Sequence, residues 1–211
     1  MAEPKGFQYA SPAHEADTAI AGMWLFLASE ALFFGGLFFV WLQLRIRHTG
    51  GVTLGAEHAN LLIGTLNTAI LLTSSLSYTL GVQRAREGRG RATAWAALVT
   101  AGLGVAFLGL KLLEWGLDLR DGLFPGVHFA LTGQNAGGAH LFYDLYWVAT
   151  GLHGAHMLVG IGLVLLIARR AWQGEFSPAY TTPVEVTGLY WSFVDVIWII
   201  LYALIYVVGR A

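Results

Sequence analysis

Residues 20–44 read IAGMWLFLASEALFFGGLFFVWLQL, an apolar run in which Glu30 is the one charged residue. A helix needs about 20 consecutive apolar residues to cross the hydrocarbon core of a bilayer, so this stretch is long enough for one span. Four more apolar stretches of spanning length occupy residues 60–82, 92–115, 142–168 and 186–208. The sequence therefore predicts an all-α fold, a polytopic integral membrane bundle with five transmembrane helices.

The composition of the whole chain agrees with a membrane protein. Of its 211 residues, 56% are hydrophobic and 12% are charged, and the mean hydropathy is +0.60. An average soluble domain has about 25% charged residues. The net charge is −1 and the basic cluster from Arg84 to Arg91 stands alone, so no nucleic-acid surface is indicated. The chain has no cysteine, which excludes disulfides, iron–sulfur clusters and a copper centre held by two thiolates.

Polar residues divide the chain into two predicted parts. Residues 1–19 are predicted to form a polar N-terminal tail without a signal peptide, and residues 20–211 the five-helix membrane domain. The connection from Gly116 to Leu141 is predicted to be a long, glycine-rich loop. Because long loops in compact proteins are often functional, this one is interpreted either as a partner contact or lid, or as idle slack.

Lysine and arginine counts on the two sides of the membrane predict the orientation, because cytoplasmic loops are enriched in these residues. Seven fall on the side of the N-terminus: Lys5, Arg84, Arg86, Arg89, Arg91, Arg169 and Arg170. Five fall on the other side: Arg45, Arg47, Lys111, Arg120 and Arg210. The counts favour a cytoplasmic N-terminus and, after five spans, a C-terminus outside.

Four ionisable residues are predicted to lie near mid-membrane: Glu30, His153, His156 and Asp195. At the helical rise, Glu30 lies about 15 Å into the first span and Asp195 about 14 Å into the fifth. An acid at the bilayer centre costs about 2.5–3.5 kcal/mol on insertion scales, so contacts with protein, headgroups or water must keep it there. Two interpretations stay open for the acids: a proton-handling site, or carboxyl groups that only hydrogen-bond inside the bundle.

Two residue pairs at helical spacing are candidates for local sites. His153 and His156 could present two imidazoles on one face, but two ligands are half a metal site and bis-histidine haem needs ligands from opposite sides. Hydrogen bonding within the bundle is therefore favoured over metal binding. Lys111 and Glu114 are predicted to pair near the outer end of the third span, with the lysine side chain snorkelling to the interface.

Several segments together resemble the subunit III family of haem-copper oxidases. Gly22–Glu30 (GMWLFLASE) resembles the helix that holds the family's carbodiimide-reactive glutamate. Thr150–His156 (TGLHGAH) and Gly188–Trp198 (GLYWSFVDVIW) resemble its fourth and fifth helices. Segments of the second and third helices also match, at Leu66–Ser74 and Lys111–Gly122. The matches occur in order along nearly the whole chain.

The sequence departs from the family pattern in three places. Mitochondrial members have seven helices, and this chain resembles the shorter five-helix bacterial form that lacks the first two. Ser192 and Glu185 stand where the family commonly has histidine, so the resemblance transfers no role for an imidazole at either position. The loop from Gly116 to Leu141 also looks extended, which points to a partner specific to this oxidase.

The resemblance implies a non-redox accessory subunit of a cytochrome c oxidase. Such a chain holds no cofactor and no metal itself, packs directly against subunit I and supports the stability of that subunit. The complex also contains subunit II, haem and copper. The chain is expected to bind phospholipid and to support proton uptake and the durability of turnover. Glu30 is the first candidate for the proton and lipid cleft, with His153, His156 and Asp195 after it. No residue is predicted to be catalytic, and the implied location is a bacterial inner (plasma) membrane.

Glu114 and Trp115 are further candidates, predicted to contact lipid headgroups at the membrane interface. The nearest alternatives to a cytochrome c oxidase subunit are the corresponding subunit of a quinol oxidase and the accessory protein of nitric-oxide reductase. Alternatives of another class are a stand-alone proton channel or transporter, and a pure assembly scaffold.

Overall fold

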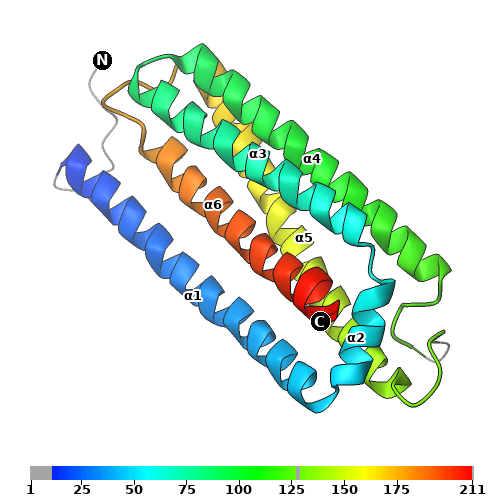
Figure 1. Ribbon diagram of the computed structural model, residues 1–211. Helices are drawn as coiled ribbons and strands as arrows, with labels where there is room; N and C mark the ends of the chain where they lie inside the picture. The colour runs from blue at the N-terminus through cyan, green and yellow to red at the C-terminus, as the bar shows by residue number, and fades with distance from the viewer. Residues whose placement is uncertain (1–10, 127–128, 211) are drawn as a thin grey trace.

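The computed structural model describes residues 11–126 and 129–210, and α-helices dominate both ranges (Figure 1). These helices are α1 (Pro12–Arg47), α2 (Thr49–His58), α3 (Leu61–Arg86), α4 (Gly90–Arg120), α5 (Ala136–Trp172) and α6 (Thr182–Tyr202). The last of them continues as the π-helical segment η1 (Ala203–Val207) and the 3-10 turn η2 (Val208–Arg210). The prediction of an all-α fold is confirmed.

Five helical stretches among the described residues are long and apolar enough to cross a membrane, as the sequence predicted. They are Ala13–Arg47, Leu61–Arg86, Gly90–Arg120, Ala136–Trp172 and Thr182–Arg210. Four of them extend past both ends of the apolar stretch from which they were predicted, and Leu61–Arg86 extends past the C-terminal end of its stretch. A helix can continue through polar residues at the edge of the hydrocarbon layer, whereas hydropathy marks only the part inside it. The count of five spans is confirmed.

Two predicted connections are shorter in the structure than in the sequence-based prediction. Helix α1 already begins at Pro12, so the tail predicted for residues 1–19 ends earlier. The Ser11 hydroxyl caps this helix by accepting a hydrogen bond from the His14 backbone N–H at 3.1 Å. Residues 1–10 lie outside the described residues. The loop predicted from Gly116 to Leu141 is also wrong at both ends, since α4 continues to Arg120 and α5 starts at Ala136. Glycine alone does not end a helix that neighbouring helices support.

Helix α2 was not predicted, because the Gly50-Gly51 pair resembles a helix terminator. Tertiary packing explains it: α2 lies across the first turns of α5, where the glycines let the two backbones come very close. The Arg45 guanidinium donates to the Thr53 hydroxyl at 2.9 Å, and the Arg210 guanidinium donates to the Ala59 carbonyl. The short helix is therefore fixed by contacts from both the end of α1 and the C-terminal turn.

Helix α6 lies at the centre of the bundle, between α1 and α3, with α5 behind it and α4 beside α3 (Figure 1). Indole N–H groups of α6 find hydroxyl acceptors on α3: Trp191 donates to Ser74 and Trp198 to Thr68, both at 3.1 Å. Helix α1 is the outermost of the five long helices, and its buried hydrophobic side chains form one narrow seam, Leu27, Phe34, Trp41 and Leu44. The bundle thus has a packed core of four helices and a fifth helix on its edge.

The tight turn between α3 and α4 concentrates positive charge at one end of the bundle. Gly88 has a φ of +73°, a backbone conformation that favours glycine, and this lets α4 start directly after α3. The Glu87 carboxylate accepts a hydrogen bond from Arg84 at 2.9 Å and lies 3.6 Å from Arg89, and the bond from Arg84 lowers the pKa of Glu87. The carboxylate therefore stays ionised between two of the arginines of this turn.

Packing of α2 on α5 gives a test of the fold. A methyl group at Gly51 would overlap the Gly138 backbone, whereas one at Gly36 of α1 meets nothing within 4 Å. We expect Gly51→Ala to destabilise the protein by about 1–3 kcal/mol through overpacking, and Gly36→Ala to leave it unchanged or slightly more stable. Thermal unfolding of the two variants in detergent, followed by circular dichroism, measures the difference; equal midpoints would contradict the close α2–α5 contact.

Candidate functional site

Glu30 of α1 and His156 of α5 meet on the seam between these two helices. The His156 Nε2 lies 3.2 Å from the Glu30 Oε2, and the other ring nitrogen, Nδ1, lies 2.8 Å from the Leu152 carbonyl oxygen. Because a carbonyl oxygen only accepts, Nδ1 carries a proton in that bond. A hydrogen bond between Nε2 and the carboxyl group then needs one more proton, on either group. The pair is a site for one shared proton.

The surroundings of this pair leave it partly open to the outside of the bundle. The side chains of His156 and Glu30 are 20% and 21% exposed. The Phe34 ring approaches the imidazole edge-on, with 5.4 Å between ring centroids, and the Tyr190 hydroxyl donates to the His156 carbonyl at 3.0 Å. The pair is therefore packed against aromatic side chains and remains partly exposed on the edge of the bundle.

His153 does not join this pair, although it precedes His156 by less than one helical turn. Its side chain is buried between Phe107 and Trp198, with ring centroids 5.6 Å and 5.2 Å away, and neither ring nitrogen has a hydrogen-bond partner among the described residues. One histidine thus points into the core and the other toward α1. Within the described part of the chain, no group of three or more His, Cys, Asp or Glu residues could hold a metal ion.

Asp195 of α6 is buried and separate from the Glu30–His156 pair. Its carboxylate interacts with the Ser75 side chain of α3. The sequence predicted Glu30, His153, His156 and Asp195 as one group of candidates. The structure joins the first and third of these, and places the other two apart from them in the bundle interior.

A buried charge cluster that the sequence revealed only in part connects α4, α5 and η1. The Lys111 ammonium donates to the Glu114 Oε2 at 2.9 Å, the Tyr146 hydroxyl at 3.0 Å and the Tyr206 hydroxyl at 2.8 Å, which uses all three of its N–H groups. Tyr146 donates onward to Asp118 at 2.8 Å, and Tyr206 to the Glu114 Oε1 at 2.8 Å. Every charged group of the cluster is therefore hydrogen-bonded inside the protein.

This cluster confirms one prediction about Lys111 and corrects two others. The Lys111–Glu114 pair exists, but the lysine is 2% exposed and does not snorkel, because two tyrosines of other helices complete its hydrogen bonds. Glu114 is fully buried, so it does not reach the surface where a lipid headgroup would lie. Trp115 is half-buried, stacks on Trp147 and donates to Thr150 at 3.3 Å.

Sequence reasoning missed Asp118, Tyr146 and Tyr206. Asp118 follows Lys111 and Glu114 at helical spacing, which was the available signal, but it fell beyond the predicted end of the third span at residue 115. The two tyrosines come from elements far away in the chain, and η1 is a π-helical segment, a feature that often marks a special site inside a helix.

Glu185 and Ser192, for which the resemblance gave no role, are seven residues apart on one face of α6. The Glu185 Oε1 accepts from the Arg86 Nε at 2.9 Å and from the Thr181 hydroxyl at 2.9 Å. Ser192 lines a cavity of about 680 Å³ between α1, α3 and α6, whose wall also includes Glu185, Arg86 and Trp24. The glutamate therefore makes an ion pair with α3 that a neutral imidazole could not make.

Comparison with known proteins decides the family. The family described as "Cytochrome c oxidase subunit III" matches residues 12–210, which include all five long helices. This chain belongs to that family. It is similar to cytochrome c oxidase subunit 3 of Thermostichus vulcanus, with 36% identity over 94% of this chain and 92% of that protein. It is also 30% identical to cytochrome c oxidase subunit 3 of Dasypus novemcinctus over 88% of this chain and 67% of that protein.

The family also includes relatives named for a different electron donor. Cytochrome bo(3) ubiquinol oxidase subunit 3 of Pseudomonas aeruginosa is 28% identical over 90% of this chain and 85% of its own length. The chain is thus subunit III of a haem-copper oxidase, a membrane protein of a respiratory complex.

The Lys111 cluster predicts that the stability of the protein depends on the Tyr206 hydroxyl group. Tyr206→Phe removes the acceptor for Lys111 and the donor for Glu114, both buried charged groups, so we expect a loss of about 1.5–3 kcal/mol in stability. Tyr202, one turn earlier, bonds the Thr65 hydroxyl in an exposed position, so Tyr202→Phe should cost about 1 kcal/mol or less. Chemical unfolding of both variants in detergent measures the two costs, and an equal cost would show that the cluster is not needed.

Proposed function

We propose that this chain is a non-redox accessory subunit of a cytochrome c oxidase-type terminal oxidase, which packs directly against subunit I, with subunit II in the same complex, binds phospholipid and supports proton uptake during oxygen reduction. The observation that carries the proposal is the Glu30–His156 pair, a shared-proton site about 20% exposed on the edge of the bundle. Such a pair can take up or release a proton beside a neighbour's proton path without a metal of its own.

Several features support the accessory role over catalysis by this chain. No cluster of three or more metal-ligating side chains occurs among residues 11–126 and 129–210, and His153 lies between aromatic rings instead of facing the pair. Asp195, like His153, serves in this proposal as a buried polar group of the bundle that adjusts the field around the pair from a distance. The alternative of a quinol oxidase subunit rests on relatives of that name.

We propose a bacterial inner membrane location with the N-terminus in the cytoplasm and the C-terminus outside. The charge rule counts the lysines and arginines of the loops outside the membrane. Lys111 is buried inside the bundle, so it does not count against a cytoplasmic N-terminus. Leaving out Lys111 lowers the count of lysines and arginines on the outer side from five to four, against seven on the side of the N-terminus. The arginines of the α3–α4 turn, Arg84, Arg86, Arg89 and Arg91, then mark the cytoplasmic end.

Replacing the shared-proton site tests the proposal. In the complete oxidase, Glu30→Gln should leave the haem and copper spectra and the initial turnover unchanged, but should lower proton uptake and shorten several-fold the number of turnovers before inactivation. Glu57→Gln, a matched change of an exposed glutamate on α2, should have neither effect. The measurement is oxygen consumption over many turnovers together with proton uptake in vesicles.

The outcomes separate the rival functions. Turnover and durability equal to the wild type in Glu30→Gln would leave only a scaffold role. Proton flux through the purified chain alone in liposomes would point instead to a stand-alone channel.

A further inference from the structure

Few side chains hold helix α1 against the bundle, and they are unevenly spread along it. Between residues 13 and 33, Leu27 is the one buried side chain. The second half of the helix buries three hydrophobic side chains, Phe34, Trp41 and Leu44. It also leads directly into α2, which the hydrogen bonds from Arg45 and Arg210 fix in place. The first half of α1 is therefore the less firmly held part.

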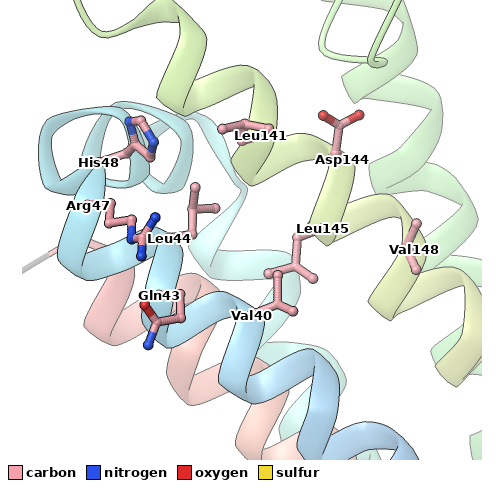
Figure 2. Close-up of a pocket in the computed structure, with 9 residues that line it drawn as sticks. All are labelled: Val40, Gln43, Leu44, Arg47, His48, Leu141, Asp144, Leu145 and Val148. Atoms are coloured by element: carbon pink, nitrogen blue, oxygen red, sulfur yellow. The ribbon is translucent and has the colours of Figure 1, made fainter.

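Two cavities separate α1 from its neighbours. The cavity of about 680 Å³ lies between the first half of α1, α3 and α6, with Ile20 and Trp24 on its α1 wall. A second cavity, of about 570 Å³, lies between the end of α1 and the beginning of α5. Its wall includes Val40 and Leu44 of α1 on one side and Leu145 of α5 on the other (Figure 2). Along α1, the residue of the shared-proton pair falls between the residues that line the two cavities.

The Glu30–His156 hydrogen bond joins α1 to α5 at this place between the cavities. Among the described residues, it is the one hydrogen bond that connects residues 20–44 of α1 to α5 or α6. Ring contacts accompany it: Phe34 lies against the imidazole, and Phe26 stacks on Tyr190 with 6.2 Å between ring centroids. A hydrogen bond weakens steeply with distance and angle, whereas stacked rings tolerate a range of separations. The position of α1 therefore depends on whether this bond can form.

The bond depends in turn on the shared proton. The His156 Nδ1 donates to the Leu152 carbonyl oxygen at 2.8 Å, so Nε2 either donates to Glu30 as part of an imidazolium or accepts from a protonated Glu30. When the site loses its proton, a neutral imidazole with one N–H faces two oxygen acceptors. Whichever oxygen keeps that N–H, the other contact brings two lone pairs together. The ring and the carboxylate then cannot both stay in place.

Other titratable groups near the pair are committed elsewhere. On α1, Glu30 is the one charged residue between positions 20 and 44. On α6, the Tyr190 hydroxyl donates to the His156 carbonyl at 3.0 Å, and Asp195 interacts with Ser75 of α3. On α5, His153 points into the core between two aromatic rings. The proton of the pair is thus the one that decides the hydrogen bond.

We infer that α1 is a proton-linked lever. Its first half is seated on the bundle while Glu30 and His156 share a proton, and it moves away from α5 when that proton leaves, turning about the end that α2 anchors. The cavity beside Ile20 and Trp24 leaves room for this movement without disturbing the four-helix core. The inference rests on the shared-proton site of the proposed function and adds a movement to it.

The length of the lever sets the size of the movement. Glu30 lies 15 residues before Arg45 in α1, and Ala19 lies 26 residues before it. At the helical rise, these positions are about 22 Å and about 39 Å from the anchored end. A shift of about 2 Å at Glu30 is enough to break the hydrogen bond. It becomes a shift of about 3–4 Å at Ala19.

Pulsed electron paramagnetic resonance on the complete oxidase in nanodiscs measures this movement. Spin labels at Ala19→Cys and Gln173→Cys, two exposed positions, report the distance between the beginning of α1 and the end of α5. The chain has no cysteine of its own, and the oxidase without the introduced pair gives the background signal of the other subunits. Raising the pH from about 5 to about 10, a range in which imidazoles titrate, should lengthen the distance by about 3–4 Å.

Variants of the pair make the result specific. Glu30→Gln bonds the imidazole through an amide N–H that does not titrate, so the distance should keep its acid value at both pH values. His156→Phe keeps a ring but forms no hydrogen bond, so the distance should be long at both. Glu57→Gln, a change of an exposed glutamate on α2, should respond to pH as the wild type does. Labels at Arg91→Cys and Gln173→Cys, which leave α1 out, should show no change with pH.

Any of three results would overturn the lever. They are a wild-type distance that is the same at both pH values, a pH response in Glu30→Gln equal to that of the wild type, and an equal lengthening between the labels on α4 and α5. The readout is a distance, so it is separate from proton uptake. Unchanged turnover and uptake in Glu30→Gln would remove the proposed function and leave the lever standing, whereas a fixed distance with lowered uptake would remove the lever alone.

Discussion

The structure depends on how a fully buried ammonium group is neutralised inside a membrane-spanning bundle. The side chain of Lys111 is buried, and its three N–H groups are bound by Glu114, Tyr146 and Tyr206. These partners come from α4, α5 and η1, so satisfying one charge fixes three elements relative to one another. Burying an ion pair costs free energy, and removing one partner leaves an uncompensated charge in the interior. The cluster therefore adds little net stability, but it restricts these helices to the packing in which every charge has its partner.

The bundle holds two kinds of polar cluster, one enclosed within the protein and one partly exposed on its edge. In the Lys111 cluster every charged group has a partner within the chain, and the surface does not reach it. The Glu30–His156 pair is the opposite, because it holds one shared proton and remains one-fifth exposed on the edge of the bundle. Low dielectric strengthens both sets of hydrogen bonds, but only the second set is partly exposed at the surface of the bundle. The difference follows from the helices that carry them: α4 lies in the core and α1 on its edge.

The sequence predicted the parts of this fold that depend on local composition. Apolar length was enough to find five spans, and the i, i+3 spacing was enough to find the Lys111–Glu114 pair. Sequence could not supply partners that come from distant elements, such as Tyr206 for Lys111 or α5 for α2. It also could not tell His153 from His156: the two lie on neighbouring parts of one helix face, and the packing of Phe107 and Trp198 on one side and Glu30 on the other separates them. The predicted third span ended before Asp118, because a charged residue whose partners are unknown reads as the end of a membrane-spanning segment.

The edge position of α1 determines how the Glu30–His156 pair is held. Helix α1 contributes Glu30 to this pair, on the seam that it shares with α5. Since only a narrow strip of α1 is buried, its position against α5 depends on few contacts: the Glu30–His156 bond, the Phe34 ring and the anchoring of α2 by Arg45 and Arg210. The geometry of the Glu30–His156 pair therefore depends on the packing of a helix that few contacts hold in place.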